Sequence, residues 1–213
     1  MSGKFLIEIA RRQFEEDLLE QVLEAERMYR NAVSESRRPD TENPGAVEPA
    51  LAKYRRLLGL FTNLVLDERP SRGLLLKTVL DAAIETLGAD RGAIQVVAAR
   101  AVLKLEAQRG FGREAESANV CGCQSCRIAL ETSQRVVVED VTQSPLFAGT
   151  SCLQAMLQAG LRAVQVTPLV NGQGQAIGIL STHFCKTTHL GGRELSMLDR
   201  LSQQAAYFIE AYG

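Results

Sequence analysis

The sequence predicts an α+β fold in which a central antiparallel β-sheet is flanked by helices and preceded by long N-terminal helices. Two observations carry this expectation. Apolar residues recur every three or four positions as far as Gly88, and every second position in the runs that follow it, so a helical period gives way to the period of strands. The apolar runs 163–170 and 176–184 flank the turn sequence Asn-Gly-Gln-Gly, which predicts a β-hairpin.

The first helix is expected to be unusually long. Its apolar stripe runs from about Phe5 to Ser36, and a helix of that length spans on the order of 45 Å. Because a small domain is narrower than this, part of the stripe is expected to face a second chain or an adjoining helix. The polar run 37–45 contains two prolines and a glycine and is the expected linker.

Two more helices are predicted before the sheet. The second carries an apolar stripe and ends near Pro70; its stripe is Leu51, Tyr54, Leu58, Phe61 and Val65. The third begins after Ser71, a suitable N-cap, and ends at Gly88 with a left-handed cap. We therefore expect residues 1–70 to form a helical extension for dimerisation or docking, and residues 71–213 to form a second domain.

Five strands and a closing helix follow. The first four strands are expected at 93–99, 103–108, 135–141 and 163–170, and the fifth at 176–184. A helix from about Gly192 to Tyr212 then presents one apolar face. No glycine-rich phosphate loop occurs, which argues against a parallel nucleotide-binding sheet.

Composition excludes several classes of function. The chain has 24 Lys and Arg against 25 Asp and Glu, a net charge of −1, so it lacks the field that attracts nucleic acids. No apolar stretch approaches the roughly 18–20 residues of a membrane span, and the N-terminus does not resemble a secretory signal. We expect a cytoplasmic protein that binds neither nucleic acid nor membrane. Its five cysteines, an odd number, are expected to be reduced thiols.

Several segments in a fixed order resemble one family. They are GADRGAIQ (88–95), QRGF (108–111), RVVVEDV (135–141), PLF (145–147), AGLRAVQVTPL (159–169) and GILSTHF (178–184). From about Leu74 to Tyr212 the chain resembles a GAF domain of the kind attached to bacterial signalling proteins, which implies a GAF/PAS-like sheet and a sensor role. The Asn-Lys-Phe-Asp-Glu signature of cyclic-nucleotide binders and the Cys-His pair of bilin binders are both absent. Haem would need an axial ligand such as His183.

A cluster of cysteines departs from an ordinary GAF domain. Cys121, Cys123 and Cys126 form a C-x-C-x-x-C motif, in which a tight turn would let three sulfurs converge on zinc, copper(I) or an iron–sulfur cluster. The resemblance implies that the loop carrying Cys152 folds toward the same side of the sheet and supplies a fourth ligand, with Asp140 and His183 as reserves. Reversible thiol chemistry and ordinary core packing remain alternatives.

A second resemblance indicates an enzyme. The free methionine sulfoxide reductases are also GAF domains, and the order of Cys121 and Cys152 is similar to their nucleophilic and resolving cysteines. In that reaction Glu139 or Asp140 would bind a substrate amine or protonate an oxygen, although a capping role at a strand end is the simpler interpretation.

The main expectation is a small regulatory GAF-domain protein. It would form a homodimer, sense an unidentified small molecule, a metal or the redox state, and signal through contacts with a partner protein. The candidate pocket residues are Cys126, Asp140, Phe147, Gln165, Thr182 and His183. For Gln165 and Thr182, a cross-strand hydrogen bond is an equal alternative to a place in the pocket.

Overall fold

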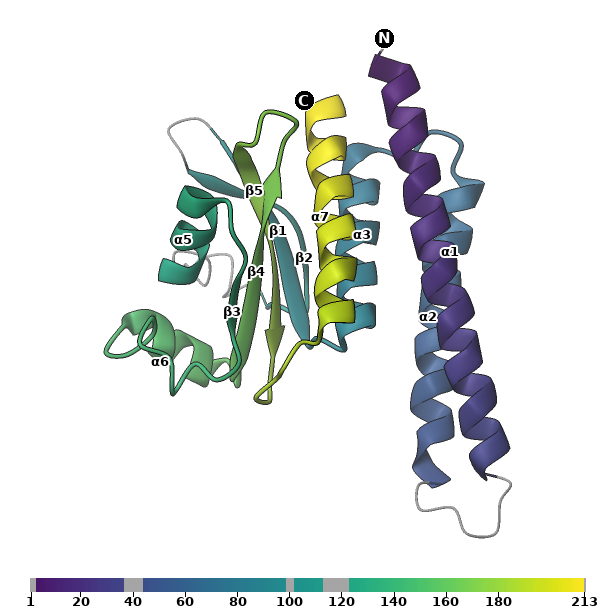
Figure 1. Cartoon of the computed structure of the whole chain (residues 1–213), viewed down its shortest axis with the longest axis horizontal. Coiled ribbons are helices and arrows are strands. Elements are labelled where there is room, and N and C mark those ends of the chain that lie inside the picture. The colour runs from purple at the N-terminus through teal and green to yellow at the C-terminus, as the bar shows by residue number, and fades with distance from the viewer. Residues whose placement is uncertain (1–2, 37–43, 99–101, 113–122, 213) are drawn as a thin grey trace. The chain divides into compact units, whose positions relative to one another are not determined.

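The computed structural model describes residues 3–36, 44–98, 102–112 and 123–212, and the chain divides into two compact units, 1–71 and 72–213. In the first unit, helices α1 (Gly3–Ser36) and α2 (Val47–Leu66) lie side by side, with the short helix η1 (Pro44–Ala46) leading into α2 (Figure 1). The predicted long first helix is therefore confirmed. The predicted linker falls largely on residues 37–43, which lie outside the described residues.

A narrow apolar seam holds α1 and α2 together. The buried side chains are Phe14, Leu18, Val22 and Ala25 on α1, and Leu57 and Leu64 on α2. The rings of Tyr29 and Tyr54 stack with centroids 6.4 Å apart. Arg11 also donates hydrogen bonds of 3.0 Å to the carbonyl oxygens of Leu64 and Glu68.

The buried side of α2 differs from the predicted one. The sequence stripe includes Leu58 and Val65, yet the structure buries their neighbours Leu57 and Leu64 and leaves the predicted pair 38% and 44% exposed. Each pair differs by one position, which is about 100° around a helix. The hairpin therefore has more apolar surface on α2 than α1 covers.

The second unit contains a five-stranded antiparallel sheet. The strands are β1 (Arg91–Val97), β2 (Leu103–Arg109), β3 (Val136–Val138), β4 (Ala163–Val170) and β5 (Ala176–Phe184). Their order across the sheet is β2-β1-β5-β4-β3, and every neighbouring pair is antiparallel. The predicted antiparallel α+β fold is confirmed, and the bounds of the β4–β5 hairpin agree with the prediction. Strand β3 is shorter than predicted, because the Val141 N–H bonds to the Arg162 carbonyl outside the ladder.

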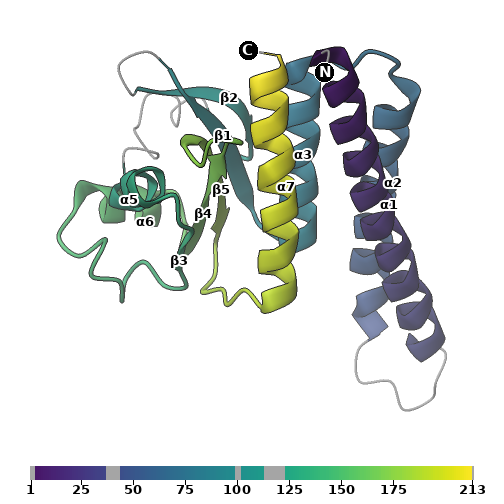
Figure 2. The same ribbon diagram turned by 45° about the horizontal axis from the view of Figure 1, so that its top comes forward.

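Helices cover both faces of this sheet. On one face, helices α3 (Arg72–Leu87) and α7 (Gly192–Ala211) lie side by side (Figure 1). On the other lie two short helices that the sequence did not predict, α5 (Gln124–Thr132) and α6 (Ser151–Gln158), as Figure 2 also shows. We call these the α3–α7 face and the α5–α6 face. Helix α3 ends at Gly88, whose φ of 64° confirms the predicted left-handed cap.

Side-chain alternation assigns residues to the two faces. At Gly92 a Cβ atom would lie 2.9 Å from Leu80 and 3.1 Å from Ile84, so this position of β1 faces α3. The α5–α6 face has its own apolar core: Cys123, Cys126, Ala129, Val138, Val141, Phe147, Met156, Leu161, Val164, Val166 and Ile179. None of the described helices is long and apolar enough to cross a membrane.

Candidate functional site

A disulfide lies on the α5–α6 face. Cys123 is the N-cap residue of α5, Cys152 is the second residue of α6, and the structure joins them with a Cα–Cα distance of 5.9 Å. Thr150 caps α6, its hydroxyl accepting a hydrogen bond of 3.2 Å from the Leu153 N–H. The expectation that these two cysteines are reduced thiols is wrong, because the fold places the ends of two helices within disulfide distance.

The described part of the C-x-C-x-x-C motif, residues 123–126, forms the start of a helix. This helix, α5, begins inside the motif, and the Cys126 N–H donates a hydrogen bond of 3.0 Å to the Cys123 carbonyl. Cys126 is buried one turn along the helix and is not part of a disulfide. Cys121 lies outside the described residues, so neither the expected four-cysteine metal site nor the Cys121–Cys152 reductase pair is tested. Within the described residues, no group of three or more His, Cys, Asp or Glu side chains could hold a metal ion.

His183 is buried on the same face of the sheet. Burial, and then the positive charge of Arg91, lower the pKa of the imidazole from 6.5 to about 4, so the ring is neutral at pH 7. Its Nε2 lies 3.3 Å from the Ser181 hydroxyl, and its Nδ1 has no hydrogen-bond partner among the described residues. The Phe111 ring meets it edge-on with centroids 5.2 Å apart. The imidazole is therefore held in a largely apolar site.

The Arg91 side chain lies beside the Phe111 ring and bonds to the chain that follows α6. Its guanidinium carbon lies 5.8 Å from the centre of the Phe111 ring, and Nη2 donates a hydrogen bond of 2.9 Å to the Ala159 carbonyl. The side chain thereby links strand β1 to the residue that follows α6. Sequence reasoning gave Arg91 and Phe111 no role at the site, although both fall within the segments that carry the GAF resemblance.

Two glutamines were also missed. The side-chain oxygens of Gln95 and Gln108 are buried, and within the part of the chain that the structure describes neither has a hydrogen-bond partner. Gln95 pairs with Ile179 across the sheet and Gln108 with Ala93, so both side chains are on the same face as His183. Gln95 lies between Ile94 and Val96 in β1, so a period-two analysis would have found it. Gln108 could not be found in this way, because the register shift between β1 and β2 puts it on the face opposite to that of Lys104, with which simple alternation groups it.

The structure separates the predicted pocket residues into groups. Cys126, Phe147 and His183 belong to the α5–α6 face. The side chains of Gln165 and Thr182 belong to the α3–α7 face, where they are hydrogen-bonded to each other at 2.9 Å. The alternative of a cross-strand hydrogen bond therefore describes Gln165 and Thr182.

A polar network continues from that pair toward α7. Gln165 is also hydrogen-bonded to the Thr167 hydroxyl, which accepts a hydrogen bond of 2.8 Å from Arg135. Arg135 in turn forms an ion pair with Asp199 of α7. These contacts tie the helix to the sheet, and no part of the network reaches the α5–α6 core.

The acidic candidates are engaged in surface contacts. Asp140 accepts hydrogen bonds of 2.9 and 2.6 Å from the N–H and hydroxyl of Thr142, which lower the pKa of its carboxyl, and Arg162 lies 3.0 Å away. Glu139 lies 2.5 Å from Nδ1 of the exposed His189. Both carboxylates therefore contact neighbouring side chains near the end of β3.

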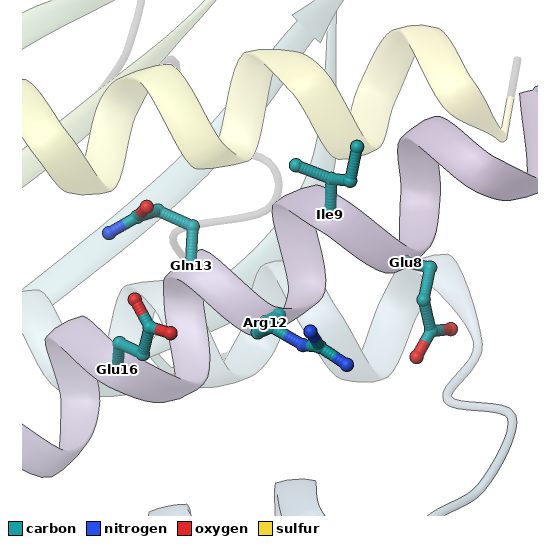
Figure 3. A pocket seen from close by; sticks show the side chains of 5 residues that line it. All are labelled: Glu8, Ile9, Arg12, Gln13 and Glu16. Atoms are coloured by element: carbon teal, nitrogen blue, oxygen red, sulfur yellow. The ribbon is translucent and has the colours of Figure 1, made fainter. Parts of the chain in front are cut away.

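One hollow lies along α1 in the first unit. Figure 3 shows the five side chains that line it: Glu8, Ile9, Arg12, Gln13 and Glu16. All of them come from a single helix and most are charged or polar. They offer no converging set of groups, so we assign no ligand to this hollow.

Comparison with known proteins establishes the family. The sequence profile of the GAF domain matches residues 71–209, and the chain therefore belongs to the GAF family, a family of signalling and sensor domains. No curated protein matches the chain significantly.

Solved structures of the same fold are distant in sequence. The GAF domain of a phosphoenolpyruvate-protein phosphotransferase from Coxiella burnetii is 16% identical with a TM-score of 0.57, covering 75% of this chain and 94% of that one. A domain of a two-component sensor histidine kinase from Sinorhizobium meliloti is 19% identical with a TM-score of 0.55, covering 67% and 92%. A GAF domain/HD domain protein from Geobacter sulfurreducens is 16% identical with a TM-score of 0.53, covering 66% and 94%. At these identities the likeness concerns the fold alone.

Proposed function

We propose that this protein is a regulatory GAF protein that senses redox state through Cys123 and Cys152. The observation that carries the proposal is the disulfide between them, which joins α5 to α6 on the face opposite α3 and α7. Oxidation would form this bond with loss of two electrons and two protons, and a dithiol reductant would break it. The state of one bond would thus determine whether two elements of the α5–α6 face are joined.

The positions of the two cysteines favour a reversible bond over a purely structural one. Cys123 caps α5 and Cys152 lies in the first turn of α6, so both sulfurs are attached at helix N-termini. The N–H groups and dipole of a helix N-terminus stabilise a thiolate, and a disulfide whose reduced form is stabilised is more easily reduced. Cys152 is only half-buried, which leaves the bond accessible to a reductant.

We further propose that the signal is transmitted through the helices of the first unit, which would pair with a second copy of the chain. Leu19 and Leu23 on α1 and Leu58 and Val65 on α2 are all exposed. Each of these residues lies about 100–140° around its helix from a buried residue of the α1–α2 seam, so the exposed residues form a strip along each helix. Because the two helices are antiparallel, this rotation places both strips on the same side of the hairpin. Two such hairpins would bury the strips in a four-helix bundle.

The redox proposal is tested by mapping the disulfide in solution. Trypsin places Cys123 in peptide 114–127 and Cys152 in peptide 136–162, so the bond links two peptides of known mass. The full chain is equilibrated in dithiothreitol buffers of increasing oxidised fraction, its remaining thiols are alkylated, and the linked pair is quantified. We expect one reversible two-electron transition. Cys185→Ser is the matched control, because this exposed cysteine is outside the cluster and its replacement should not move the transition.

Two results would count against sensing. If no linked peptide forms under any oxidising condition, the redox proposal is wrong. If the intact protein reduces free methionine sulfoxide with a thiol reductant, and Cys121→Ser abolishes turnover, the cysteines belong to an enzyme of the reductase type. The same samples are assayed for both outcomes.

A further inference from the structure

Cys126 is a third cysteine close in sequence to the Cys123–Cys152 disulfide. Cys123 is the N-cap residue of α5 and Cys126 is the third residue of that helix, and at this spacing Cβ atoms lie roughly 5–6 Å apart. Both sulfurs belong to the apolar core of the α5–α6 face, where Cys123 is 5% and Cys126 4% exposed. Cys152 packs against the same core. Three cysteine side chains therefore border one apolar core, and one disulfide joins two of them.

We propose that Cys126 exchanges with this disulfide, so that the oxidised protein interconverts between a Cys123–Cys152 and a Cys123–Cys126 bond. The inference rests on the redox function proposed above. The Cys126 thiolate attacks Sγ of Cys123, the Cys123–Cys152 bond breaks, and Cys152 leaves as a thiolate. The proton lost by Cys126 is taken up by Cys152, and one disulfide is present before and after. The step needs no oxidant or reductant.

The arrangement determines which sulfur is attacked and which leaves. Cys123 is on the same helix as Cys126, so the new bond closes a Cys-x-x-Cys loop at the start of α5, a spacing common in redox-active dithiols. The leaving thiolate is at the N-terminus of α6, where its negative charge is stabilised. Stabilisation of the leaving thiolate accelerates exchange.

The consequence is a second oxidised state in which α5 and α6 are no longer joined. In this state Cys152 carries a thiol, and its side chain is half-buried. It can then attack a low-molecular-weight disulfide, forming a mixed disulfide and releasing one low-molecular-weight thiol. Oxidation alone would thus not determine whether α5 and α6 are joined. That would depend on how the oxidised protein is distributed between the two disulfides.

The experiment measures which two cysteines the disulfide joins at successive times. The full chain carrying Cys121→Ser is used, so that an internal disulfide in peptide 114–127 can join only Cys123 and Cys126. The protein is oxidised at pH 5, moved to pH 8, and quenched at intervals with acid and then N-ethylmaleimide. We expect linked peptides to be replaced in part by an internally bridged 114–127 and a 136–162 labelled at Cys152. The rate should rise close to tenfold per pH unit, because the attacking species is the thiolate.

Controls separate this exchange from other events. Cys126→Ser in the same background should keep the linked peptides intact, and the rate should not change with protein concentration, because the exchange is intramolecular. A linked pair that forms but persists unchanged for a day at pH 8 overturns the exchange and leaves the redox proposal standing. A linked pair that never forms overturns the redox proposal itself. If Cys126→Ser does not fold, the time course and concentration dependence of the parent chain decide the question.

Discussion

At the scale of single residues, the burial of His183 has a measurable energetic consequence. The pKa of its imidazole is about 4 in the folded protein, and an unfolded histidine has a pKa near 6.5. Between these values the unfolded state binds more protons, so the free energy of unfolding should fall as the pH falls through this window. From pH 7 to pH 5 the loss should be roughly 2 kcal/mol, measured by urea unfolding.

A substitution isolates the contribution of His183 from that of the other groups. His183→Gln should remove most of this pH dependence above pH 5. An equal slope in wild type and His183→Gln would mean that the imidazole is not buried in its neutral form.

Gly92 is the second residue that makes a direct prediction. A Cβ atom there would lie 2.9 Å from Leu80 and 3.0 Å from the Ser181 carbonyl, so α3 would have to move away from the sheet. Gly92→Ala should reduce the free energy of unfolding by roughly 1–3 kcal/mol. Gly73 is on α3, and no described atom lies within 4 Å of the position of an added Cβ there. Gly73→Ala should therefore raise the free energy of unfolding by up to about 1 kcal/mol. Denaturant midpoints of the two variants give the comparison.

At the scale of elements, the disulfide should stabilise the second unit only while it is formed. It closes a loop of 29 residues, for which chain entropy gives roughly 3–4 kcal/mol. We expect urea unfolding of the oxidised chain to require more denaturant than unfolding in dithiothreitol. Cys152→Ala should be insensitive to the reductant, whereas Cys185→Ser should behave like wild type. Equal midpoints with and without dithiothreitol in wild type would contradict this prediction.

The elements that the sequence predicted are those with long, regular patterns. Helices α1, α3 and α7 and the β4–β5 hairpin each carry several repeats of one period, bounded by glycine or proline. Helices α5 and α6 have nine and eight residues, little more than two turns, and the first turn of each contains serine and cysteine, residues of modest helix propensity. Their stability comes from packing on the α5–α6 core, which is a property of the tertiary fold.

The site was only partly predictable for the same reason. Clustering of cysteines in the sequence correctly drew attention to residues 121–126, and the GAF resemblance brought Cys152 into consideration. Pairing of Cys123 with Cys152 depends on where α6 lies relative to α5, which no local pattern contains. The side of the sheet that Gln165 and Thr182 occupy depends on the register of β4 against β5.

At the scale of the whole molecule, the exposed strip of the α1–α2 hairpin predicts a homodimer. A chain in which Leu58 and Val65 are both changed to lysine should have half the molar mass of wild type in light scattering, because two charges would be placed in the bundle core. Val102→Lys, an equally apolar and exposed position in the second unit, should not change the mass. A wild-type chain that is already monomeric would contradict the prediction.

The covalent bond between α5 and α6 also determines how the protein would respond in time. A bound ligand dissociates when its concentration falls, so a ligand sensor reports present conditions. A disulfide persists after the oxidant has gone, until a thiol attacks it, and uncatalysed rearrangement takes minutes to hours. A brief oxidative pulse would therefore leave a lasting record in Cys123 and Cys152, and the domain would report the recent history of the cell.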